Sequence, residues 1–193
     1  MISPTNITNY NRSQAEMEEF LLFSIMVAGK GAKVTAQKLD SFLAQRDTWG
    51  LDDKSPLAYI KWLIHQDRLM EQLVAHKLGQ YNRLAKSFAG IVKFKGRLDK
   101  VSVQDLESVS GIGHKTARFF VLHSRKDVRL AVLDTHILKW LKLHGEDAPK
   151  ATPTGKKYAL LEEAFLTYAW KYEMTPADLD LNIWKQYSQK QIK

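Results

Sequence analysis

The sequence predicts an all-α protein, and three observations lead to that prediction. Capping signals for helices recur along the 193 residues, whereas strand-type alternation of apolar and polar residues is almost absent. Apolar residues repeat at spacings of three or four positions. Glycine and proline breakers leave segments of about ten to twenty residues between them, which is the length of short helices.

Two helices are predicted to begin at capping boxes. Ser13 with Glu16 precedes the apolar run FLLFSIMVA, and Ser102 with Asp105 repeats the pattern further along the chain. In a capping box the hydroxyl accepts a hydrogen bond from the later backbone N–H, and the later side chain accepts one from the earlier N–H. Two backbone donors at the helix start are thereby satisfied.

Two more helices are predicted to begin at a hydroxyl residue followed by proline. Ser55 precedes Pro56, and Thr175 precedes Pro176. A proline in the first helical position loses nothing, because its missing N–H would have no partner there. Between these two starts, the segment KKYALLEEAFLTYAWKY spaces its apolar residues as an amphipathic helix does, at Tyr158, Leu161, Phe165 and Tyr168.

The composition restricts the class of protein and of partner. Lys and Arg outnumber Asp and Glu by 29 to 21, so the formal net charge is +8, which favours a polyanion such as nucleic acid, although an ordinary basic protein has the same balance. The absence of cysteine excludes disulfides, thiolate zinc sites and cysteine-ligated iron–sulfur clusters. No run approaches the roughly 18 apolar residues of a membrane span, and the polar N-terminal stretch is no signal peptide. We therefore expect a cytoplasmic protein.

A glycine turn in SGIGHK is the first candidate for a binding site. Gly111 and Gly113 allow a sharp backbone turn and a close approach to a ligand, and the helix that follows adds its N-terminal amides. Such a turn can hold a DNA phosphate, with His114 and the distant Lys30 as further candidate contacts. A plain corner between two helices has the same pattern.

The residues around this turn resemble a known superfamily. LESVSGIGHKTARFF is similar to the helix-hairpin-helix of DNA repair proteins, and the continuation AVLDTHILKWL resembles the endonuclease III superfamily of DNA glycosylases. The resemblance extends over roughly residues 18 to 145 and includes LGQYNRLAKSF. It implies two helical subdomains, 29–128 with the hairpin and 1–28 plus 129–193, with the active site in the cleft between them.

The resemblance assigns catalysis to Lys115 and Asp134. Lys115 lies in the first turn of its helix, where the helix dipole and partial burial disfavour an ammonium, and a neutral amine can attack C1′ of a flipped nucleotide to give a Schiff base. Asp134 would stabilise positive charge on the sugar and help to move the lysine proton. The alternatives are a lysine that contacts phosphate or solvent and an aspartate that only caps a helix.

The C-terminal stretch narrows the resemblance. Endonuclease III itself carries cysteines, which this chain lacks, whereas MTPADLDLNIWKQYSQKQIK is similar to the end of the small archaeal and bacterial 8-oxoguanine DNA glycosylases. That likeness implies that Trp184 stacks on the extruded base and that the terminal carboxylate of Lys193 reaches the base pocket. Phe119, one turn beyond Lys115, is a candidate pocket residue, and core packing is an equal explanation.

We therefore expect a bifunctional 8-oxoguanine DNA glycosylase and AP lyase of base-excision repair. Its partner would be damaged duplex DNA, and the enzyme would be a monomer. We expect no metal or other cofactor, although a monovalent ion at the hairpin is left open. A departure from the resemblance is that Gly29 and Lys30 stand where many relatives have a gap-filling glutamine. The alternatives are a glycosylase for another base and a helix-hairpin-helix module that binds DNA without catalysis.

Overall fold

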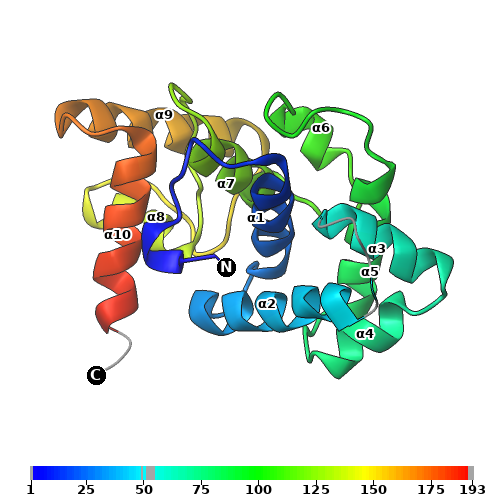
Figure 1. Cartoon of the computed structure of the whole chain (residues 1–193). Coiled ribbons are helices and arrows are strands. Elements are labelled where there is room, and N and C mark those ends of the chain that lie inside the picture. Colours follow the sequence, from blue (N-terminus) through cyan, green and yellow to red (C-terminus); the bar gives the residue numbers. More distant parts are fainter. Residues whose placement is uncertain (1, 49, 51–54, 191–193) are drawn as a thin grey trace. The chain divides into compact units, whose positions relative to one another are not determined.

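The chain is all-α, as the sequence predicts. In the computed structural model, which describes residues 2–48, 50 and 55–190, every regular element of the described residues is a helix (Figure 1). None of the helices in this described part is long and apolar enough to cross a membrane. The contacts divide the chain into two compact units, which are described separately.

The first unit comprises the segment that ends at Pro4 and Asn11–Gly113. Its helices are α1 (Gln14–Met26), α2 (Ala32–Thr48), α3 (Pro56–His65), α4 (Leu69–Ala75), α5 (Tyr81–Lys93) and α6 (Val103–Glu107). Helix α1 packs against α2, α3 and α5, and its residues from Phe20 to Met26 are all buried. The aromatic centre of this core includes Phe42, whose ring lies 5.3 Å from Tyr59 and 6.4 Å from Phe88.

The second unit comprises Thr5–Tyr10 and the chain from His114 onward. Its helices are α7 (His114–Ser124), α8 (Thr135–Leu143), α9 (Gly155–Lys171) and α10 (Pro176–Lys190). Helix α10 packs against α7, α8 and α9, and the largest apolar cluster includes Leu141, Phe165 and Ile183. The short helix η1 (Pro4–Asn6) begins where the chain passes into this unit.

The predicted helix starts are confirmed. Both capping boxes form, Ser13 with Glu16 and Ser102 with Asp105. The Ser55 hydroxyl accepts a hydrogen bond from Ala58 N at 3.1 Å. Thr175 does the same for Asp178 N at 3.1 Å, ahead of the proline that begins α10.

The division of the chain differs from the boundaries expected from the resemblance, 29–128 and 1–28 plus 129–193. Helix α1 lies in the first unit, because its apolar residues are buried on nearly every side against α2, α3 and α5. The boundary falls between Gly113 and His114, so α7 belongs with the C-terminal helices. As a result Lys115 and Asp134 lie in one unit.

Candidate active site

Helices α7 and α8 bring Lys115 and Asp134 together. Lys115 is the second residue of α7, and its Nζ lies 3.9 Å from Asp134 Oδ2. The Lys115 side chain is 34% exposed and that of Asp134 17%, so the pair is accessible without being fully solvated. The two side chains are thus close enough to interact as an ion pair.

Asp134 is held in place as the N-cap of α8. Its Oδ1 accepts hydrogen bonds from His136 N at 2.8 Å and Ile137 N at 2.9 Å. These donors belong to the first turn of the helix, where backbone amides stabilise negative charge. Because Oδ1 takes both amides, Oδ2 is the oxygen that lies toward Lys115. Capping the helix and facing the lysine are therefore simultaneous roles of one side chain.

One face of α7 carries Lys115, Phe119 and His123, four residues apart in succession. The rings of Phe119 and His123 meet at 5.0 Å with an interplanar angle of 63°. Phe119 also packs against the small apolar cluster that includes Leu122 and Val132. The packing interpretation of Phe119 therefore has direct support, and its part in a base pocket stays a prediction.

Helix α10 contributes a buried carboxylate to the same unit. Asp180 Oδ2 lies 3.1 Å from His123 Nε2, and on the other side of this fully buried ring His123 Nδ1 is 2.8 Å from the Thr8 hydroxyl. Burial raises the pKa of Asp180, with Asp134 acting in the same direction and His123 and Lys115 in the opposite one. Motif analysis missed this residue, although it stands in the LDL of the C-terminal resemblance.

Trp184 follows Asp180 by one turn of α10 and therefore lies on the same face of that helix. Its side chain is half-buried, while the preceding Ile183 is buried in the apolar core. Stacking of Trp184 on an extruded base stays a prediction. Lys193, the second predicted base-binding residue, lies outside the described residues.

One of the two glycines in the turn has the backbone conformation that requires glycine. Gly111 has a φ of +85°, and a Cβ added there would lie 2.3 Å from the Ser87 hydroxyl, which is itself bonded to the Ser110 carbonyl. Gly113 has no positive φ and nothing near its Cβ position. It is exposed, so its backbone is open to a ligand. Phosphate binding by these glycines stays a prediction.

Two further candidate phosphate contacts have partners in the protein. Lys30 Nζ donates hydrogen bonds to the carbonyls of Leu78 at 2.5 Å and Gly79 at 3.4 Å, so in this structure its ammonium holds the turn that precedes α5. Burial is the main reason why its pKa is lowered. His114, the first residue of α7, lies with its ring 5.7 Å from that of Tyr158.

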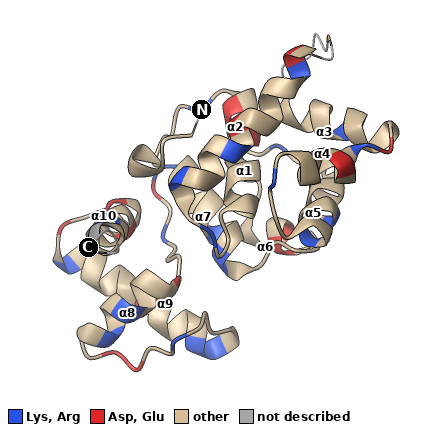
Figure 2. Ribbon diagram, turned by 90° about the horizontal axis from the view of Figure 1, so that it is seen from below, with Lys and Arg blue, Asp and Glu red and all other residues tan. Residues whose placement is uncertain are grey.

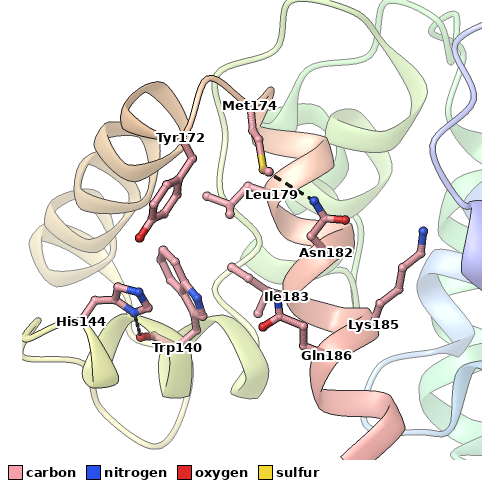
Figure 3. A pocket seen from close by; sticks show the side chains of 9 residues that line it. All are labelled: Trp140, His144, Tyr172, Met174, Leu179, Asn182, Ile183, Lys185 and Gln186. Carbon is pink, nitrogen blue, oxygen red and sulfur yellow. Dashed lines mark hydrogen bonds between the residues drawn. The ribbon is translucent and has the colours of Figure 1, made fainter.

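A separate pocket lies among α8, the end of α9 and α10 (Figure 3). Its volume is about 450 Å³, and Trp140 and Tyr172 are among its aromatic walls. The Trp140 ring lies 3.9 Å from the ring of His144. Neither Lys115 nor Asp134 lines this pocket. In the described part of the chain, no group of three His, Asp or Glu side chains is arranged to hold a metal ion.

Comparison with known proteins confirms the expected sequence resemblance. No family model matches the chain. It is 33% identical over 81 residues to an 8-oxoguanine DNA glycosylase/AP lyase of Thermotoga sp. (strain RQ2), covering 41% of this chain and 38% of the relative. A protein of the same name from Thermoplasma volcanium is 32% identical over 133 residues, 63% of this chain and 62% of the relative. The chain thus spans about two fifths of the length of the first relative.

The similarity to solved structures extends over a larger part of the chain than the sequence alignments do. A Methanocaldococcus jannaschii 8-oxoguanine glycosylase/lyase, in complex with a 15mer DNA containing 8-oxoguanine, matches with a TM-score of 0.69 and 21% identity over 96% of this chain and 87% of its own. The 8-oxoguanine DNA glycosylase of Thermotoga maritima matches with a TM-score of 0.66 and 22% identity, over 94% and 85% of the two chains. The all-α fold is therefore that of these glycosylases.

Proposed function

We propose that this protein is a bifunctional 8-oxoguanine DNA glycosylase and AP lyase that acts in base-excision repair. The observation that carries the proposal is the lysine–aspartate pair, with Lys115 Nζ 3.9 Å from an Asp134 carboxylate that two backbone amides hold in place. A similar sequence in named 8-oxoguanine DNA glycosylase/AP lyases and a shared fold support it.

The reaction proceeds through Lys115 as nucleophile. Its neutral amine attacks C1′ of the flipped nucleotide, the C1′–N9 bond breaks, and the base leaves with the electron pair. Loss of the amine proton and opening of the sugar ring then give a Schiff base, from which β-elimination cleaves the strand. The Asp134 carboxylate stabilises the positive charge that develops on the sugar.

The damaged base is 8-oxoguanine, which differs from guanine by a donor at N7 and a carbonyl at C8. A pocket with a correctly placed acceptor discriminates between the two bases. Trp184 supplies a stacking face on α10, where it is half-buried. Stacking of this kind contributes ~1–3 kcal/mol per base.

The partner is duplex DNA, the monomer is the working unit, and no cofactor is needed, because an amine and a carboxylate suffice for these steps. The basic charge supports contact with phosphates: Lys and Arg recur on helices of both units, α5, α7 and α8 among them (Figure 2). We place the enzyme in the cytoplasm, at the nucleoid, because its substrate is chromosomal DNA.

Borohydride trapping tests the proposal. Wild-type protein is incubated with duplexes that contain 8-oxoguanine, guanine, an abasic site or another lesion, and the covalent adduct is measured after reduction. We expect an adduct with 8-oxoguanine and with the abasic site, none with guanine, and a loss of at least ~10²-fold in Lys115→Gln. Lys139→Gln is the matched control, since Lys139 is an exposed lysine of α8.

The outcomes separate the competing functions. An adduct with another lesion alone would make the protein a glycosylase of different specificity. Binding to duplexes without an adduct on any lesion would leave a DNA-binding module without catalysis. An adduct of equal yield in Lys115→Gln would show that another residue is the nucleophile.

A further inference from the structure

Asp180 is a buried carboxylate that the proposed reaction does not use. Its side chain is only 9% exposed, and Oδ2 is engaged with His123. Among the described residues, Oδ1 has no hydrogen-bond partner. A buried polar oxygen without a partner is costly and calls for an explanation at a functional site.

The position of Asp180 links it to the lysine–aspartate pair. Helix α10 packs against both α7 and α8, which carry Lys115 and Asp134. Both of these residues act electrostatically on the Asp180 carboxyl. His123, its direct partner, lies two turns beyond Lys115 on the same face of α7.

The two carboxyls of this unit have opposite surroundings. Asp134 Oδ1 accepts two backbone amide hydrogen bonds at the start of α8. Asp180 is buried away from such backbone donors, and burial raises its pKa, which makes its carboxylate a stronger base than an exposed one. The capped Asp134 is held by backbone amides, whereas the buried Asp180 keeps one oxygen without a partner among the described residues and so can take a proton.

The hydrogen-bonded chain from Thr8 through His123 holds Asp180 in one orientation. With Asp180 ionised, His123 Nε2–H donates to Oδ2 and Nδ1 accepts from the Thr8 hydroxyl. Oδ1 can then take a proton without breaking the bond from His123. Second partners of this kind commonly fix the orientation of a group that takes part in proton transfer.

We infer that Asp180 is a positioning residue that acts through Lys115 and accepts the proton which the lysine ammonium must lose before its amine attacks. One N–H bond of Lys115 breaks, an O–H bond forms on Asp180 Oδ1, and the electron pair stays on nitrogen. Asp134 stabilises the positive charge that develops on the sugar. This inference rests on the proposed function and divides between two carboxylates the work first assigned to one.

Few polar groups surround the Asp180 carboxyl in the described part of the unit. From the helices packed against α10 and the segment before α1, the polar groups that face Asp180 or sense its charge are His123 and Lys115 of α7, Asp134 at the start of α8, Tyr158 of α9 and Thr8. Burial also raises the pKa of Tyr158, which keeps its hydroxyl neutral.

The test is the pH profile of adduct formation under single-turnover conditions. Asp180→Asn keeps the shape of the side chain and removes the proton acceptor. We expect its rate constant near pH 7 to fall by at least ~10²-fold and to approach that of wild type as the pH rises, because solvent then takes the proton. Affinity for the 8-oxoguanine duplex should stay unchanged. Asp178→Asn, an exposed position on the same helix, is the matched control and should keep the wild-type profile.

Chemical rescue provides a second test if Asp180→Asn folds poorly. Asp180→Ala leaves space for a small carboxylate. Formate should therefore raise the rate constant of adduct formation by this variant at least tenfold over its value without formate. A rate loss that is equal at all pH values, together with failure of formate, would overturn the inference and leave Asp180 a structural residue. If wild type forms an adduct and only this pattern fails, the proposed function stands. If wild type forms no adduct on any lesion, both fall.

Discussion

Asp134 shows how one side chain can serve both the fold and the proposed chemistry. Oδ1 caps α8 through two backbone amides, and Oδ2 lies toward Lys115. An N-cap fixes the side-chain rotamer, so the carboxylate is positioned before any substrate arrives. The helix-cap and catalytic interpretations of this residue are therefore compatible.

Asparagine at position 134 separates the two roles. Because asparagine caps helices as well as aspartate, Asp134→Asn should change the free energy of unfolding by less than about 0.5 kcal/mol, whereas Asp134→Ala should lose about 0.5–2 kcal/mol. Both variants should form the borohydride adduct ~10²–10³-fold more slowly, because the negative charge is lost. Thermal unfolding and single-turnover trapping measure the two effects. A fully active Asp134→Asn would exclude a role for the charge.

At the scale of elements, the two glycines in the turn between α6 and α7 differ in backbone conformation and in the space around them. Gly111 needs a positive φ and has the Ser87 hydroxyl where a Cβ would lie, whereas Gly113 has ordinary φ and open space. The motif G-x-G therefore combines a glycine that the fold requires with one that it does not. Gly113 is exposed and has open space at its Cβ position, so a phosphate can approach its backbone.

Alanine substitutions distinguish these glycines. Gly111→Ala should destabilise the protein by about 1–3 kcal/mol, because alanine is strained at positive φ. Gly113→Ala should stay within about 0.5 kcal/mol of wild type. It should nevertheless weaken binding to duplex DNA, since a methyl group would keep the phosphate away. Thermal unfolding and fluorescence anisotropy provide the measurements, and unchanged affinity in Gly113→Ala would contradict phosphate binding there.

The elements were more predictable from the sequence than the site. Capping residues bond to backbone groups within three positions of the helix start. The local sequence around Ser13, Ser55 and Ser102 is therefore enough to predict where their helices begin. The bond between His123 and Asp180 joins residues 57 positions apart, and no local pattern encodes it. Likewise, the carbonyls that occupy Lys30 lie 48 and 49 positions away.

At the scale of the whole molecule, charge governs the expected association with DNA. The formal charge of +8 is spread over helices of both units (Figure 2). Contacts with phosphates release counterions and carry no sequence information. In the proposed function, charge therefore contributes to affinity for any duplex, whereas discrimination of the lesion depends on the residues that contact the base.

Salt dependence separates these two contributions. The logarithm of the association constant should fall linearly with the logarithm of salt concentration, with a slope of about −2 or steeper, since each phosphate contact adds about −0.9. Undamaged and 8-oxoguanine duplexes should have the same slope and differ by a constant offset. Anisotropy titrations between 50 and 200 mM salt, a range in which the effect is large, measure both. A flat dependence would contradict electrostatic binding to the DNA backbone.

The segment Thr5–Tyr10 has a consequence for synthesis of the chain. It belongs to the second unit, where Thr8 and Asn9 bond to His123, yet the ribosome makes it before residues Asn11–Gly113 of the first unit. Its docking site exists only after more than a hundred further residues have emerged, and Asp180 arrives later still. The first unit can fold during translation, whereas the unit that carries Lys115 cannot be complete before Asp180 and the rest of α10 have emerged.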